Sequence, residues 1–146
     1  MGVAPCMSGP DAAVARKALE EVCARGDMGL AVECYAPDFV DHVNAVDLHG
    51  HEGIRKSTDL YRALFDDLQI RVVDQISEGD RVVSRWVITG SNRGRPAELS
   101  GITISRMEGG RIVEDWSALD SLELLRQLGL VRSLLAAPRL LQATRG

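Results

Sequence analysis

The spacing of apolar residues along the chain changes from about four to two near position 68. Between Val14 and Val22 apolar side chains recur at every fourth position, which predicts a helix that begins near Pro10 and ends at Gly26. A second, shorter helix is indicated around residues 30–35, and a third runs from about residue 52 to residue 67. The N-terminal half is therefore predicted to be mainly helical.

Beyond the third helix, apolar and polar residues alternate. Four strands are predicted, at residues 69–80, 81–91, 97–108 and 111–119. Short Gly-containing turns separate them, and short links between consecutive strands favour antiparallel hairpins. Helices followed by a meander of strands predict the α+β fold class, with a strongly curved antiparallel sheet whose concave face packs against the helices.

The remaining segments show weaker patterns. Residues 38–43 are predicted to be extended, and the polar stretch 44–53 is predicted to be a loop. We see no internal repeat and no linker between domains. We therefore expect a single domain over residues 1–146, with a core over about residues 8–130 and a C-terminal tail over residues 131–146.

Composition narrows the range of partners. The chain has 146 residues and a formal net charge of −4, with acidic and basic residues interspersed. A concentrated basic face, which nucleic acid or an anionic membrane would favour, is not indicated. No apolar run approaches the roughly 20 residues of a membrane span. Three cysteines without a C-x-x-C pair predict reduced thiols in a cytoplasmic protein, and the three histidines lack metal-site spacing.

Acidic residues are concentrated around a tryptophan at the end of the last strand. Glu114, Asp115 and Asp120 lie within seven positions that also hold Trp116. Strand alternation predicts two faces, one with Ile112, Glu114, Trp116 and Ala118 and the other with Val113 and Asp115. A carboxyl group against an indole in a dry pocket has its pKa raised toward neutrality, as an acid/base catalyst needs. Asp120 is our candidate for that role.

Each of these acids also has a simpler interpretation. Asp120, or Ser121 beside it, is well placed as the N-cap of a short helix that ends at Gly129. The capping and catalytic roles of Asp120 are compatible. Glu114 and Asp115 are interpreted most simply as solvated strand residues.

Further candidates lie on strands and on the third helix. Trp86 and Arg85 are adjacent and must face opposite sides, so Trp86 is either core or a wall on which a planar substrate stacks. Arg106 is a candidate to pair with a carboxylate or to donate to a substrate carbonyl, and if it faces inward it lowers the pKa of Asp120. Tyr61 is expected in the helix core, with its hydroxyl as an alternative pocket donor.

Several segments resemble one known family. The stretches "YAPDFVDHV", "HGHEGIRK" and "EGDRVVSRWVITGS" are similar to the SnoaL-like polyketide cyclases of the nuclear transport factor 2-like superfamily, and "GITISRMEGGRIVEDWSALDSLELLRQLGL" is the most similar. The resemblance covers about residues 15–130. It implies a cone-shaped, cystatin-like fold around a pocket, homodimers, and intramolecular aldol ring closure of polyketides without metal or organic cofactor. It also implies that Asp120 is the acid/base residue and that His42 is its partner in the pocket.

The sequence departs from the family pattern at two positions. Asn92 stands where the family usually has a His, and Arg106 stands at the spacing of a second His. Three functions therefore stay open. The first is a cofactor-free cyclase or isomerase that acts on a planar or polycyclic carbonyl compound. The second is an epoxide hydrolase, an epoxide-opening cyclase or a cofactor-independent hydroxylase, and the third is a non-catalytic module for ligand binding or dimerisation.

Overall fold

The structure, a computed structural model, describes residues 9–43 and 45–128. The elements, in chain order, are α1 (Pro10–Lys17), the π-helical segment η1 (Ala18–Cys23), α2 (Met28–Cys34), β1 (Tyr35–Val43), β2 (Val46–His49), α3 (Gly50–Leu64), β3 (Asp66–Glu78), β4 (Arg81–Asn92), β5 (Arg95–Glu108), β6 (Arg111–Leu119) and α4 (Ser121–Leu128). The C-terminal tail expected at residues 131–146 lies outside the described residues.

Six strands form one sheet in the order β2-β1-β6-β5-β4-β3. The meander from β3 to β6 is antiparallel, as its short turns predict, whereas β1 pairs with β6 in parallel. A parallel neighbour needs a long connection, and the whole chain from β2 to β5 supplies one. The α+β class is confirmed, but the sheet is mixed and not wholly antiparallel.

The stretch expected to be a polar loop, residues 44–53, instead contains a strand and a helix start. Strand β2 lies in it and pairs with β1, and α3 begins directly afterwards at Gly50. Gly50 has φ +62°, which lets the chain turn from strand to helix without strain. Gly53 lies so close to β2 that an added Cβ would be 2.8 Å from the carbonyl carbon of Leu48. The two elements are therefore packed tightly together.

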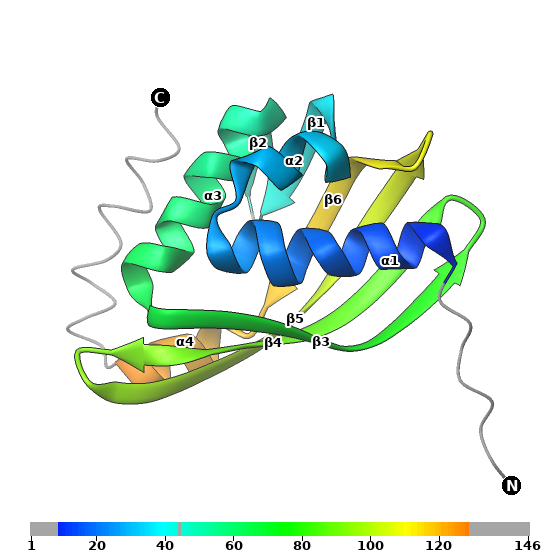
Figure 1. Ribbon diagram of the computed structural model, residues 1–146. Coiled ribbons are helices and arrows are strands. Elements are labelled where there is room, and N and C mark those ends of the chain that lie inside the picture. The colour runs from blue at the N-terminus through cyan, green and yellow to red at the C-terminus, as the bar shows by residue number, and fades with distance from the viewer. Residues whose placement is uncertain (1–8, 44, 129–146) are drawn as a thin grey trace, which may run out of the picture.

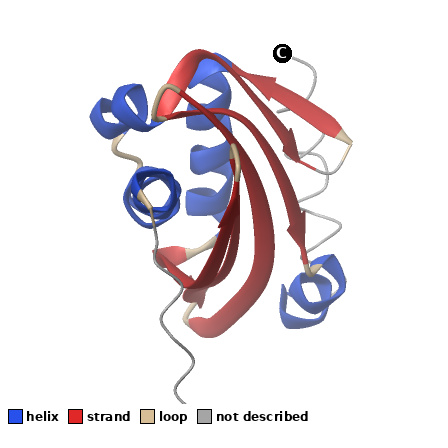
Figure 2. Cartoon of the chain, turned by 90° about the vertical axis from the view of Figure 1, so that its right-hand side faces the viewer, coloured by secondary structure: helices blue, strands red, loops and turns tan. Residues whose placement is uncertain are grey.

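The helices are divided between the two faces of the curved sheet (Figures 1 and 2). Helices α1, α2 and α3 cover the concave face, and α4 lies against the convex face. Pro10 stands at the first turn of α1, where its missing N–H has no partner to lose. Ala12 and Ala15 of α1 and Ala18 at the start of η1 are each 1% exposed, and their small side chains let these helical segments approach the strands closely. The concave face is thus the buried side of the molecule.

A bulge reverses the alternation of side chains within β6. Arg106 pairs with Glu114, but the next pair joins Met107 to Ile112, so Val113 is an extra residue on β6. Ile112 and Asp115 consequently both lie on the buried side, whereas Glu114 lies on the convex side. The predicted grouping of Ile112 with Glu114 is wrong, because regular alternation contains no bulge.

Trp86 fills the concave face beneath the helices. Its side chain is 4% exposed, and Nε1 donates to Oγ1 of Thr103 at 2.9 Å. Arg85 points to the convex side and pairs there with Asp74, so the prediction that Trp86 and Arg85 face opposite sides is confirmed. The indole lies across β5 at Gly101, where an added Cβ would be 2.4 Å from two ring carbons. Glycine is required there for the ring to lie flat.

The substitution Gly101→Ala is expected to destabilise the fold by about 1–3 kcal/mol, because the added methyl group overlaps the Trp86 ring and the Ala118 carbonyl oxygen. Urea unfolding followed by circular dichroism measures the loss. The matched control is Ser100→Ala, which is exposed on the same strand and should change stability by less than about 0.5 kcal/mol. Equal stability of the two variants would contradict the packing described.

Candidate active site

Two carboxyl groups lie side by side in the interior. Asp41 on β1 and Asp115 on β6 are register partners of the parallel strand pair. Asp115 is only 6% exposed, and Asp41 is partly buried. Among the described residues, the Oδ1 atom of each has no hydrogen-bond partner although it is buried. Because an unsatisfied buried acceptor is costly, both oxygens are suited to receive a proton or a donor from a bound molecule.

The groups around this pair come from both layers of the molecule. Ser105 on β5 forms a hydrogen bond with Asp115. In the helical layer, Tyr61 on α3 and Cys23 on η1 are close enough to Asp41 for its charge to raise their pKa values. The Sγ atom of Cys23 lies 3.6 Å from the hydroxyl oxygen of Tyr35. Burial raises the pKa of Cys23 to about 12 and raises those of Tyr35 and Tyr61. At neutral pH these three groups are uncharged hydrogen-bond donors.

The two carboxyl groups differ in acidity. Burial and, less strongly, the nearby Asp41 carboxylate raise the pKa of Asp115 to about 8, although the hydrogen bond from Ser105 opposes the rise. Burial raises the pKa of Asp41 to about 6, and the positive charge of His42 opposes that rise. Two coupled acids with such values share one proton near pH 7. The interior thus holds one ionised and one protonated carboxyl group at the same time.

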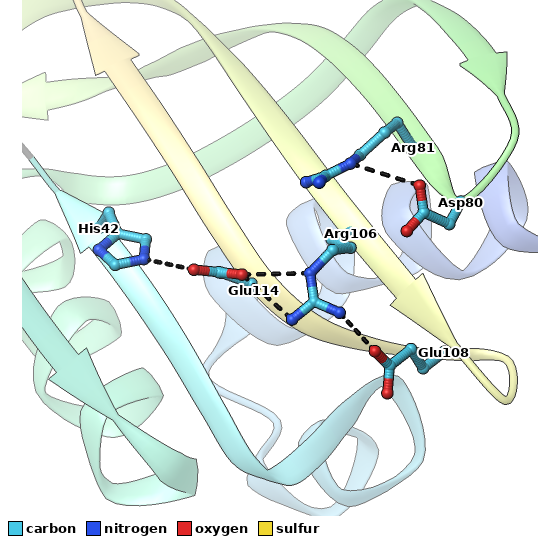
Figure 3. A network of polar contacts seen from close by, with 6 residues as sticks. All are labelled: His42, Asp80, Arg81, Arg106, Glu108 and Glu114. Atoms are coloured by element: carbon cyan, nitrogen blue, oxygen red, sulfur yellow. Dashed lines mark hydrogen bonds and ion pairs between the residues drawn. The ribbon is translucent and has the colours of Figure 1, made fainter.

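His42 belongs to a polar network on the convex face of the sheet (Figure 3). Its Nε2 lies 2.8 Å from Oε1 of Glu114, and its Nδ1 lies 2.6 Å from Oδ1 of Asp47. Arg106 donates from Nε to Oε2 of Glu114 at 3.1 Å and also bonds Glu108. The expected pocket positions of His42 and Arg106 are wrong. His42 is next to the inward Asp41 and Arg106 is next to the inward Ser105, so alternation along each strand turns both side chains outward.

Trp116 lies on the same convex face. Its ring stacks on the His42 imidazole with centroids 5.4 Å apart and an angle of 18°, and the Arg81 guanidinium lies 5.1 Å from the Trp116 ring centroid. The indole is therefore held between two basic side chains on the outside of the sheet. The expectation that Trp116 lines the interior pocket is wrong, because the bulge at Val113 places Trp116 on the face opposite to the buried Ile112.

Asp120 caps α4 and is exposed to solvent. Its Oδ1 accepts the backbone N–H of Glu123 at 3.0 Å, which confirms the N-cap interpretation. The expectation that this carboxyl group lies in a water-poor hollow beside an indole is wrong. A catalytic role for Asp120 stays a prediction, but the dry pocket on which that prediction depended does not surround this exposed side chain.

The other three candidates lie on the concave side or at its rim. Tyr61 is close enough to Asp41 for that carboxylate to raise its pKa. This proximity fits the alternative in which the Tyr61 hydroxyl is a hydrogen-bond donor in the pocket. Trp86 belongs to the buried core. Asn92, at the end of β4, donates from Nδ2 to the carbonyl oxygen of Leu64 at 2.6 Å and so joins β4 to the end of α3. Of the residues singled out, Tyr61 is thus the one whose pKa responds to the acid pair.

Sequence reasoning missed the acid pair itself. Asp41 shares strand parity with Phe39, which is 1% exposed, and this alternation is a signal that Asp41 faces inward. Asp115 was expected to be solvated, and that expectation is wrong. Its inward orientation follows from the bulge at Val113 and from pairing with β1, and no local sequence pattern predicts either feature.

Neither a metal-ligand cluster nor a membrane-spanning helix is found among the described residues. No group of three or more His, Cys, Asp or Glu side chains within residues 9–43 and 45–128 is placed to hold a metal ion. Likewise, none of the helices in those ranges has the length and apolar character needed to cross a membrane.

Comparison with solved structures places this fold in the class of nuclear transport factor 2-like proteins. A candidate polyketide cyclase from Bacillus cereus is 25% identical, with 83% of this chain and 81% of that chain covered and a TM-score of 0.75. Wild-type IdmH, a candidate polyketide cyclase from Streptomyces antibioticus, is 30% identical over 82% of this chain and 98% of its own, with a TM-score of 0.70. A protein of ketosteroid isomerase-like fold from Catenulispora acidiphila is 19% identical, covers 78% and 89%, and has a TM-score of 0.67.

The family follows from a direct match. The model of the SnoaL-like polyketide cyclase family matches residues 13–128, and the chain belongs to that family. No curated protein matches the sequence. The predicted family and fold are confirmed, whereas the reaction and its substrate are not decided by these similarities.

Removal of the Asp115 carboxyl group is expected to change how stability depends on pH. The folded pKa of about 8 lies above the ordinary value of 3.8, so the unfolded chain ionises first and stability falls as pH rises from about 4 to 8. Asp115→Asn should therefore be more stable than the natural chain at pH 8, by on the order of 1–3 kcal/mol, and similar to it near pH 4.

Urea unfolding at pH 4, 6 and 8 measures this difference. The matched control is Asp120→Asn, because Asn also serves as an N-cap and the wild-type carboxyl group is exposed. An unchanged pH dependence in Asp115→Asn would show that the carboxyl group is not buried as described.

Proposed function

We propose that this protein is a cofactor-free acid/base enzyme that acts on a planar, polyketide-like carbonyl compound. The single observation that carries the proposal is the buried pair of Asp41 and Asp115, register partners whose Oδ1 atoms have no hydrogen-bond partner among the described residues. A base and an acid side by side are what proton removal next to a carbonyl group needs. The family and the candidate polyketide cyclases among its relatives support the substrate class.

The chemistry proceeds with the proton count conserved. The Asp41 carboxylate removes a proton from the carbon next to a carbonyl group, and the electron pair of that C–H bond forms an enolate. The protonated Asp115 donates a hydrogen bond to the enolate oxygen, with Tyr61 as a second donor. The enolate carbon then attacks another carbonyl carbon of the same molecule, and the new alkoxide takes the proton back from Asp41. The outcome is ring closure, or isomerisation if Asp41 instead returns the proton to a different carbon of a conjugated enolate.

Aromatic side chains near the pair support a planar substrate. Tyr35 and Phe39, both on β1, pack edge to face with centroids 4.6 Å apart, and both are buried on the concave side. Tyr61 adds a third ring from α3. Of the three rings, the half-buried Tyr61 is the one we propose to meet a planar substrate, since Tyr35 and Phe39 are almost fully buried in the core.

The epoxide-opening alternative is less well supported. That chemistry, as it occurs in related enzymes, relies on an Arg beside two carboxyl groups. No Arg or Lys among the described residues contributes to the pKa of Asp41 or Asp115, and Arg106 pairs with Glu114 on the convex face. An enolising role fits this environment without adding a cation.

The proposal predicts different effects for three conservative substitutions. Asp41→Asn should lower the rate of hydrogen–deuterium exchange at carbon 2 of 1-tetralone, a planar bicyclic ketone, by about 100-fold or more, because the base is lost. Asp115→Asn should lower it less, since an amide still donates a hydrogen bond. Asp120→Asn should leave the rate unchanged.

Proton NMR in D₂O measures the exchange, and circular dichroism checks that each variant is folded. Loss of exchange in Asp120→Asn together with full exchange in Asp41→Asn would reverse our assignment and restore Asp120 as the catalytic acid. Full exchange in both Asp41→Asn and Asp115→Asn would end the proposal that the pair is catalytic.

We also propose a homodimer formed through the convex face of the sheet. Ile76, Val83, Ile104 and Trp116 are cross-strand neighbours and make one apolar row across β3, β4, β5 and β6. Ile76 is 66% exposed and Ile104 is 40% exposed, which is unusual for outward positions of a sheet with one solvated face. Charges beside the row are paired within the same face, so a second copy meets few unpaired charges.

The dimer proposal is tested by charge inserted into the row. Ile104→Glu should convert a dimer into a monomer, because two carboxylates would be brought into the apolar contact. Size-exclusion chromatography with light scattering measures the mass. Thr89→Glu, exposed on β4 away from the row, is the control and should stay dimeric. A dimer that persists in Ile104→Glu would contradict the use of this face.

A further inference from the structure

His42 and the acid pair occupy opposite faces of the same strands. His42 directly follows Asp41 on β1, so its ring points to the convex side while the carboxyl group points inward. Both ring nitrogens face carboxylate oxygens, one from Glu114 and one from Asp47. A neutral imidazole has only one N–H, whereas the imidazolium has two, so this arrangement favours the charged ring.

The charges behind the two acids are opposite in sign. Asp41 is followed by the His42 cation, whereas Asp115 is preceded by the Glu114 carboxylate. A nearby cation favours ionisation of a carboxyl group, and a nearby anion disfavours it. The two inward acids are register partners, so this difference across the sheet adds to the deeper burial of Asp115, which is the larger cause of its higher pKa.

We infer that His42 is a positioning residue that acts across the sheet and reinforces Asp41 as the ionised member of the acid pair. For its catalytic meaning this inference rests on the proposed function, but the order of ionisation itself does not. His42 touches no substrate in this view. It reinforces the assignment of Asp41 as base and Asp115 as acid, whereas the family resemblance implied a partner inside the pocket.

Other groups near Asp41 do not produce the same asymmetry. Those that face it are Asp115 from β6, Tyr61 from α3, Cys23 from η1 and Tyr35 from β1 itself. The phenols and the thiol have raised pKa values and stay neutral from about pH 5 to pH 9. Of the groups that face Asp41, only Asp115 therefore changes charge in this range. The hydrogen bonds to Glu114 and Asp47 raise the pKa of His42 and so favour its charged form.

The inference is tested by titration of the side-chain carboxyl carbons with carbon-13 NMR from pH 4 to pH 9. In His42→Gln the pKa of Asp41 should rise by about 0.5 to 1, because the cation behind it is removed. His42→Arg keeps a positive charge and should restore the wild-type value. His49→Gln, which changes an exposed histidine on β2, is the matched control and should have no effect.

An Asp41 titration that is the same in His42→Gln and in the natural chain would overturn the inference. Recovery in His42→Arg separates the effect of charge from that of altered packing, and a failure of Arg to restore the value would also overturn it. The exchange assay with 1-tetralone is a separate readout. In His42→Gln the acidic limb of its pH–rate profile should shift to higher pH by the same amount as the pKa of Asp41. Absence of exchange in every variant, with the NMR shift present, would end the proposed function and leave this inference standing.

Discussion

The parallel pairing of β1 with β6 is the interaction on which the interior chemistry depends. It sets Asp41 and Asp115 at the same level of the sheet and turns both toward the helices. Two ionised carboxylates in such surroundings would repel each other and lose their hydration, so one of them keeps its proton. The fold thus creates an acid and a base from two identical side chains by placement alone.

Two local features make this placement possible. The extra residue at Val113 brings Asp115 to the concave side while Ile112 stays in the core. The alanines of α1 bring the helical layer close to the strands, which removes water from the interior. The polar network of His42, Glu114 and Arg106 then lies directly behind the acids (Figure 3). The two faces of β1 and β6 are therefore linked electrostatically without sharing a hydrogen bond.

The sequence predicts the framework better than the site. The bounds of β6 are the predicted residues 111–119, and α4 begins where Asp120 was expected to cap it. These features follow from local patterns. The roles of Asp115 and Trp116 were assigned to the wrong faces because a single bulge inverts the alternation beyond it. The parallel pairing of β1 with β6 joins segments far apart in the chain, and patterns among neighbouring residues likewise do not predict it.

The same strand pairing has a consequence for how the protein folds. The two acids lie at positions 41 and 115, so they meet only when distant parts of the chain have come together. Contacts of such long sequence separation require closure of a large loop and form slowly compared with hairpins such as β4 and β5. A partly folded chain that holds the whole meander still lacks the acid pair, so the pair forms only when this long-range contact is made.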